Sequence, residues 1–118
     1  AGADAIVVSN HGGRVMDHMP GTAEVLPEIV HAVAGRVKVL VDGGVREGVD
    51  ILKMLALGAD AVMIGRPVCI AAFGAGQEGV SFYLREKMNE LKKAMILTGC
   101  GSIPNIDPSI IFRKKEDR

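Results

Sequence analysis

Hydrophobic residues along the chain gather in three short runs that are separated by longer segments with a different spacing. The runs cover residues 5–8, 37–41 and 61–64, and each is rich in Val and Ile. Short, nearly continuous apolar runs of this kind are typical of strands that are covered on both faces. We therefore predict three strands, each lying between layers of helices.

The segments between and after these runs place apolar residues three and four positions apart, as on the buried face of a helix. This spacing predicts helices over about 22–34, 48–57 and 77–97. Gly58 follows the second of them, and glycine ends helices readily because it tolerates a positive φ. Strands and helices therefore alternate along the chain, which indicates parallel βα units.

A short repeat supports this organisation. The residues Gly-Ala-Asp-Ala occur at 2–5 and again at 58–61, each time at the start of a predicted strand. The second copy follows a helix, so by analogy residue 1 would follow a helix that precedes this sequence. A closed (β/α)₈ barrel takes about 250 residues, whereas this sequence has 118. We predict an α/β fold comprising the last three βα units of a TIM (β/α)₈ barrel, with the units over 1–98 and a C-terminal tail over 99–118.

Composition narrows the class of protein. The chain is 48% hydrophobic and 3% aromatic with a formal charge of zero, and it has no apolar run near the roughly 18 residues that span a bilayer. We expect no membrane span and no binding to nucleic acid. The tail 113–118 mixes both charges and is expected to be a solvated end. Cys69 and Cys100 are expected to be reduced packing thiols, which indicates a cytoplasmic location.

Polar side chains follow each predicted strand. His11 and Arg14 come after the first strand, Asp42 and Arg46 after the second, and Arg66 after the third. In parallel barrels and open α/β sheets the carboxyl ends of the strands share one rim, where ligands bind. We therefore expect these five side chains to converge on one opening.

His11 and Arg14 suit a small carboxylic acid. An imidazole accepts a proton near neutral pH, and a guanidinium binds a carboxylate through two parallel donors. One alternative is that His11 is only a turn residue. Another is a metal site formed with Asp17 and His18, although that spacing imposes no ligand geometry. We predict a base and a carboxylate-binding residue, and no metal.

The glycines after the second and third strands suggest an anion site. Gly43, Gly44 and Gly65 would let backbone N–H groups approach a phosphate, and Arg66 would add a bidentate charge. We call these four residues the phosphate cradle. The alternative is that the glycines only form tight turns. The segment 74–79 also fits the pattern G-x-G-x-x-G, but no strand directly precedes it, which argues against a dinucleotide site.

Several of these motifs together resemble a known family. Ser9–Arg14, Leu26–Ile29, Asp42–Asp50, Leu57–Ala59 and Ile64–Pro67 are similar, in this order, to the C-terminal part of the FMN-dependent α-hydroxy acid oxidases and dehydrogenases. That family includes glycolate oxidase, lactate oxidase and L-lactate dehydrogenases. The resemblance implies a TIM barrel that binds FMN and oxidises an L-2-hydroxy acid to the 2-keto acid.

The resemblance also implies a role for each matching residue. His11 would be the catalytic base and Arg14 would bind the substrate carboxylate. Ser9 would contact the flavin, the segment 42–46 would reach the ribityl chain and phosphate, and the Gly65–Arg66 pair would complete the phosphate site. The implied cofactor-binding set is Ser9, Asp42, Gly43, Gly44, Arg46, Gly65 and Arg66.

Other groups of the family's site come from earlier strands, which lie outside this sequence. We therefore expect the enzyme to be a longer protein, a homo-oligomer at full length, and this chain alone to be inactive without its N-terminal part. The segment 15–20 departs from the family pattern, which leaves the identity of the hydroxy acid open. Two alternatives also stay open: an FMN barrel of other chemistry, such as an isomerase or nucleotide reductase, and a non-catalytic βα module. His11 and Arg14 favour the oxidation of a hydroxy acid over both alternatives, because a phosphate site alone needs neither residue.

Overall fold

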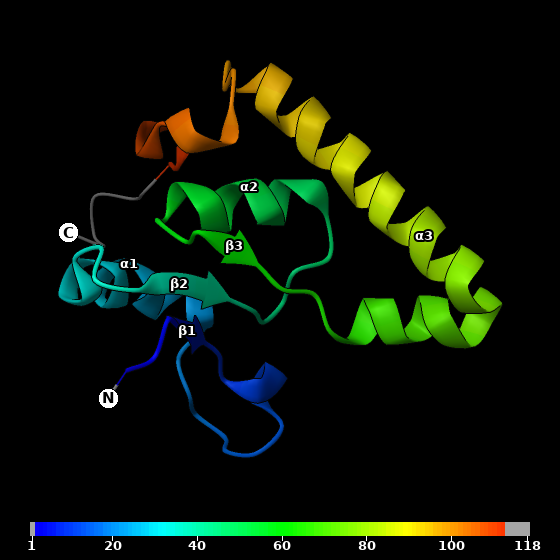
Figure 1. Cartoon of the computed structure of the whole chain (residues 1–118), viewed down its shortest axis with the longest axis horizontal. Helices are drawn as coiled ribbons and strands as arrows, with labels where there is room; N and C mark the ends of the chain where they lie inside the picture. The colour runs from blue at the N-terminus through cyan, green and yellow to red at the C-terminus, as the bar shows by residue number, and fades with distance from the viewer. Residues whose placement is uncertain (1, 113–118) are drawn as a thin grey trace.

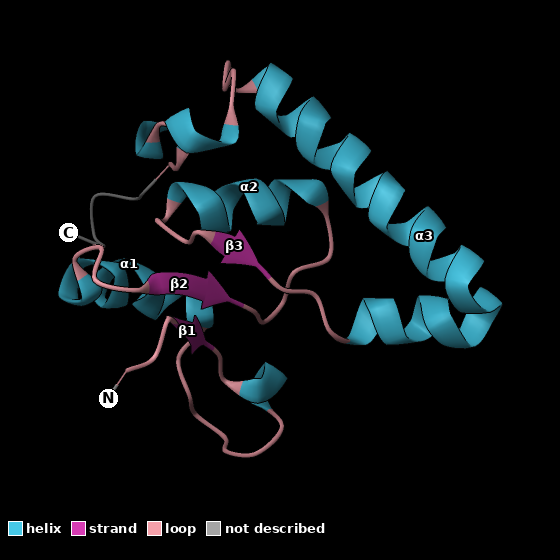
Figure 2. Ribbon diagram, in the orientation of Figure 1, coloured by secondary structure: helices cyan, strands magenta, loops and turns pink. Residues whose placement is uncertain are grey.

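The predicted alternation of strands and helices is present in the computed structural model, which describes residues 2–112. The three strands form a parallel sheet in the order β1, β2, β3, and the helices run between and after them (Figures 1 and 2). The strands are β1 (Ala5–Val8), β2 (Lys38–Val41) and β3 (Ala61–Val62), and the helices are α1 (Thr22–Val33), α2 (Gly48–Ala56) and α3 (Arg66–Leu97). Short 3-10 helices cover His11–Gly13, Ile103–Asn105 and Pro108–Ile110.

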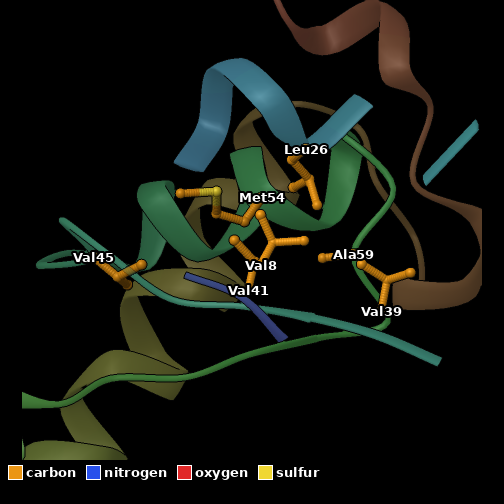
Figure 3. Close-up of a cluster of buried hydrophobic side chains, with 7 residues drawn as sticks. All are labelled: Val8, Leu26, Val39, Val41, Val45, Met54 and Ala59. Carbon is orange, nitrogen blue, oxygen red and sulfur yellow. The ribbon is translucent and has the colours of Figure 1, made fainter. Parts of the chain in front are cut away.

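The core lies between the sheet and the helices α1 and α2. Val39 and Val41 of β2 point the same way, since alternate residues of a strand share a face, and both are buried. Leu26 of α1 and Met54 of α2 meet them from the helix side (Figure 3). Burying a side chain of this size contributes about 1.5–3 kcal/mol. This cluster therefore fixes how the two helices sit on the sheet, and with them the carboxyl ends of the strands.

The opposite face of the sheet is only partly covered by residues 2–112, so the prediction of strands covered on both faces was wrong for the described part of the chain. Val7 of β1 is 49% exposed, although its neighbour Val8 is buried. Val7 pairs in register with Leu40 of β2, which is half-buried, and Leu40 pairs with Ala61 of β3. An apolar row thus crosses all three strands on the open face.

Helix α3 differs from the prediction in its start. It begins at Arg66 rather than near residue 77, and β3 ends at Val62 rather than at residue 64. The helix is bent where Ala75 and Gly76 leave helical geometry, and Gly76 has a φ of 54°. Figure 1 shows two limbs at an angle. The sequence pattern found only the second limb, because this bend interrupts the helical spacing. The segment 74–79 lies inside this helix, so it does not follow a strand directly.

The repeat at 2–5 and 58–61 has a structural basis. Gly2 and Gly58 have φ angles of 75° and 105°, and each precedes a strand by three residues. The prediction that Gly58 ends a helix through a positive φ is confirmed. Helix α2 ends at Ala56, Leu57 is its C-cap, and Gly58 follows Leu57 directly. The predicted helix before residue 1 and the predicted solvated tail 113–118 lie outside the described residues. Within 2–112, no helix is both long and apolar enough to cross a membrane.

Asp60 joins the second and third strands through its carboxylate. Oδ1 lies 2.7 Å from Lys38 Nζ, and Oδ2 accepts a hydrogen bond of 2.9 Å from the backbone N–H of Val39. The hydrogen bond from Lys38, with that from the Val39 N–H, lowers the pKa of the Asp60 carboxyl below its usual value. The carboxylate therefore adds stability at neutral pH, and this stability is lost as the pH falls through the lowered pKa.

We expect the Asp60→Asn variant to be less stable than the wild type at pH 7, and the difference to shrink as the pH falls below about 4. Denaturant unfolding at several pH values measures it. Asp4→Asn is the matched control, because Asp4 holds the same place in the repeat and is exposed, with no side-chain hydrogen bond in the described part of the chain. A stability difference for Asp60→Asn that does not change with pH would contradict the assignment.

Candidate functional site

The chain after β1 forms a tight left-handed turn that carries His11. His11, Gly12 and Gly13 have φ angles of 54°, 64° and 71°. The N–H of Gly13 donates to the carbonyl of Asn10 over 3.0 Å, and the N–H of His11 donates to Ser9 Oγ over 3.1 Å. A positive φ is uncommon for a residue other than glycine, and such strained positions cluster at functional sites. The turn thus holds an exposed imidazole directly beyond the strand.

The chain after β2 is held against the start of α1. Thr22 Oγ1 donates a hydrogen bond of 2.6 Å to the carbonyl of Asp42, and the Thr22 side chain is buried. Gly43 has a φ of 99°, and a Cβ at this position would lie 2.9 Å from Thr22 Oγ1. Only glycine combines this backbone conformation with so close an approach. Gly44 follows with a φ of 73°, and its Cβ position meets only open space.

The chain after β3 turns at Gly65 and enters α3 at Arg66. The Arg66 side chain reaches the turn after β1: a Cβ on Gly12 would lie 2.8 Å from Arg66 Nη2. β1 and β3 are not neighbours in the sheet, because β2 lies between them. The Arg66 side chain therefore reaches from the end of β3 to the turn after β1, so that residues following all three strands lie near one another.

These strand ends line an open cavity of about 260 Å³. Every candidate site residue except Ser9 lines it, which agrees with the expected convergence. The lining comprises His11, Gly12, Arg14, Asp42, Gly43, Gly44, Val45, Arg46, Met63, Ile64, Gly65, Arg66 and Cys69. The imidazole and guanidinium from the first loop thus share an opening with the phosphate cradle.

The chemistry of the lining suits a phosphate ester that carries hydroxyl groups. Arg46 and Arg66 bring two guanidinium groups, and the positive end of the α3 dipole lies at Gly65. Cβ atoms at Gly44 and Gly65 would meet no protein atom within 4 Å, so their absence leaves room for an anion to approach the backbone. Asp42 Oδ1 is buried without a hydrogen-bond partner in the described residues. It is an acceptor that a ligand hydroxyl would satisfy.

Ser9 lies apart from this set. It lines a separate cavity beside β1 with Met19 and Val25, and its hydroxyl already accepts from the His11 N–H. Its contact with a flavin stays a prediction. The sequence interpretation also missed two residues that hold the loops of the site. Thr22, which resembles an ordinary first residue of a helix, bonds to the loop after β2, and the Asn10 side chain bonds to the loop after β1. Among residues 2–112, no three His, Cys, Asp or Glu side chains gather in a way that could hold a metal ion, and both cysteines are free thiols.

Comparison with known proteins identifies related sequences. The chain is 51% identical over 116 residues to the peroxisomal (S)-2-hydroxyacid oxidase GLO4 of Arabidopsis thaliana, covering 98% of this chain and 32% of that protein. It is 52% identical over 110 residues to an L-lactate oxidase of Nostoc, covering 93% of this chain and 30% of that protein. The chain thus spans about a third of the length of these relatives.

Solved structures of oxidases also resemble this chain. A crystal structure of mandelate oxidase with (S)-2-phenylpropionate matches with a TM-score of 0.86 at 51% identity, over 91% of this chain and 32% of that one. The sequence model that describes FMN-dependent dehydrogenases matches residues 1–113. The order of strands, the strand-end site and these matches agree, and the chain belongs to the family of FMN-dependent dehydrogenases, whose cofactor is FMN.

Proposed function

We propose that this chain supplies the base, the carboxylate-binding residue and the phosphate cradle of an enzyme that oxidises L-2-hydroxy acids to 2-keto acids with FMN. The observation that carries the proposal is the shared cavity, where His11 and Arg14 lie with Gly44, Gly65 and Arg66. Binding of the FMN phosphate needs the cradle alone, so the imidazole and the guanidinium beside it favour the oxidation of a hydroxy acid over other chemistry of an FMN-binding barrel.

The open face of the sheet supports the predicted architecture. The apolar row of Val7, Leu40 and Ala61 is incompletely covered, and the interiors of (β/α)₈ barrels are filled by layers of such side chains from successive strands. The outer edges of β1 and β3 have no partner strand within residues 2–112. We infer that the three βα units are the last of a TIM barrel, whose remaining strands belong to a longer protein.

The cavity fits FMN at its phosphate end. Arg46 and Arg66 would bind the phosphate through charge-assisted hydrogen bonds, which are shorter and stronger than neutral ones. Backbone groups at Gly44 and Gly65 would approach it closely, and Asp42 Oδ1 would accept from a ribityl hydroxyl. When bound, FMN accepts the two electrons that the oxidation releases.

His11 and Arg14 would act on the hydroxy acid. The Arg14 guanidinium binds its carboxylate through two parallel hydrogen bonds, each worth about 1.5–3 kcal/mol for a charged group. This fixes the orientation of the α-carbon, and the His11 imidazole then accepts the proton that the substrate gives up. A positioned base of this kind typically contributes about 10²–10⁴ to the rate.

The identity of the hydroxy acid, a homo-oligomeric assembly and a cytoplasmic location stay predictions. One relative carries the word peroxisomal in its name, so location is best tested directly by imaging the tagged protein. The segment 15–20, which differs from the family pattern, follows Arg14 directly, and each of its residues is exposed. It is the part of this chain that we expect to influence the choice of side chain on the hydroxy acid.

Anaerobic titration tests the proposed function. We expect the flavin absorbance of the FMN-loaded, full-length protein to be bleached by an L-2-hydroxy acid such as L-lactate, or by the achiral glycolate, and D-lactate to leave it unchanged. Equal concentrations of the matching 2-keto acid serve as a control, since it can bind but has no electrons to give. If no 2-hydroxy acid of a panel with small, branched and aromatic side chains bleaches the flavin, the proposed function is wrong.

A further inference from the structure

The loop that carries His11 and Arg14 has little to hold it in place. All of its residues from 11 to 20 are exposed, so none anchors it in the core. Two of them, His11 and His18, have positive φ angles of 54° and 63°, which costs free energy for a residue other than glycine. A loop of this kind keeps one conformation only where other contacts close it.

Asn10 supplies such a contact. Its side-chain Nδ2 donates a hydrogen bond of 3.2 Å to the carbonyl of Pro20, which joins the two ends of the loop. The backbone carbonyl of the same residue accepts from the Gly13 N–H and so also fixes the turn at His11. One residue therefore holds both the start of the loop and its end.

The orientation of the Asn10 amide places it between the loop and the phosphate cradle. A carbonyl can only accept a hydrogen bond, so the amide nitrogen must face Pro20 and the amide oxygen must face the other way. That oxygen lies 3.5 Å from the Cβ position of Gly43. It is buried and has no donor within the described residues. The amide thus bonds to the end of the loop after β1 through its nitrogen, while its oxygen lies close to the place where a side chain on Gly43 would stand.

We propose that Asn10 is a positioning residue that holds His11 and Arg14 in register with the phosphate cradle. This rests on the proposed function, since it concerns the residues assigned there to the hydroxy acid. Without the bond to Pro20, the loop opens and Arg14 and His11 no longer meet the same substrate molecule. Misplacement by about 1 Å can cost a hundredfold in rate. The groups that bind the phosphate lie after the end of β2 and at the start of α3, outside the loop from 11 to 20, and we expect them to keep their places.

The test compares three variants of the FMN-loaded, full-length protein. Asn10→Asp keeps an oxygen facing Gly43 but replaces the donor to Pro20 with a second acceptor. Asn10→Ala removes the whole amide, and with it the bond to Pro20, without adding charge. Asn89→Asp is the matched control, because Asn89 is exposed on α3 and far along the chain from the loop. The readouts are kcat and KM for the L-2-hydroxy acid, the FMN dissociation constant, and the rate at which trypsin cuts after Arg14, identified by mass spectrometry.

For both Asn10 variants we expect kcat to fall, KM to rise, and kcat/KM to drop by about tenfold or more. We expect trypsin to cut after Arg14 about tenfold faster, while the FMN dissociation constant stays within about twofold, since the cradle is intact. Variants that match Asn89→Asp in cleavage and kcat/KM would overturn the proposal. A parallel loss of FMN affinity, or unfolding of both Asn10 variants, would overturn it as well, by assigning Asn10 to cofactor binding or to folding. The trypsin measurement needs no turnover, so it judges Asn10 even if the wild type oxidises no hydroxy acid.

Discussion

Replacing His11 with Asn or Gln is expected to slow anaerobic flavin reduction by an L-2-hydroxy acid by about 10²–10⁴. An imidazole can serve as a general base at neutral pH, whereas an amide has no comparable basicity. The FMN dissociation constant should stay unchanged, because the phosphate cradle and Arg46 are intact. Stopped-flow absorbance measures the rate of reduction, and quenching of flavin fluorescence measures FMN binding.

The choice of His11→Asn removes a structural ambiguity. His11 has a φ of 54°, and Asn tolerates this left-handed conformation better than most residues. The backbone of the turn is therefore kept while the base is lost. His31→Gln is the control, since His31 is exposed on α1 and does not line the site cavity. Reduction of the His11→Asn flavin at the wild-type rate would remove His11 from the chemistry.

Replacing Gly48 with Ala is expected to destabilise the protein by about 3 kcal/mol. Gly48 starts α2 and is buried against α3, where a Cβ would overlap the backbone of Glu90 and Leu91. Backbone cannot move aside as a side chain can, so the helices must separate. The Gly48 N–H also donates a hydrogen bond of 2.8 Å to Glu90 Oε2, which this separation would break. Urea unfolding monitored by circular dichroism measures the loss.

Gly74→Ala is the matched control, because Gly74 lies in the first limb of α3 with no atom within 4 Å of its Cβ position. An alanine in an unobstructed helix is more favourable than glycine by about 0.5–1 kcal/mol. The two substitutions should therefore change stability in opposite directions. A Gly48→Ala variant as stable as the wild type would show that α2 and α3 are not packed as closely as the structure has them.

The strands and the first two helices could be predicted because their signals are local. Val39 and Val41 alternate with less buried neighbours, and the helical spacing around Leu26 and Leu52 is regular. The first limb of α3 was missed because Ala75 and Gly76 break the spacing, and whether a glycine bends a helix or ends it depends on what packs nearby. The covering of both strand faces was predicted wrongly. The sequence of an apolar strand is the same whether its second face packs against helices or is left exposed, as Val7 is here.

The sequence by itself determined which chemical groups follow each strand: an imidazole and a guanidinium after β1, glycines and an arginine after β2, and a glycine and an arginine after β3. Parallel strands bring these groups to one edge, so their convergence could be predicted from order alone. Only the tertiary structure showed that Arg66 reaches Gly12, that Asp42 Oδ1 is buried without a partner among residues 2–112, and that Asn10 bonds to Pro20 with its amide oxygen near Gly43. These features depend on distances between side chains that are remote in the sequence, and no local pattern of residues records such distances.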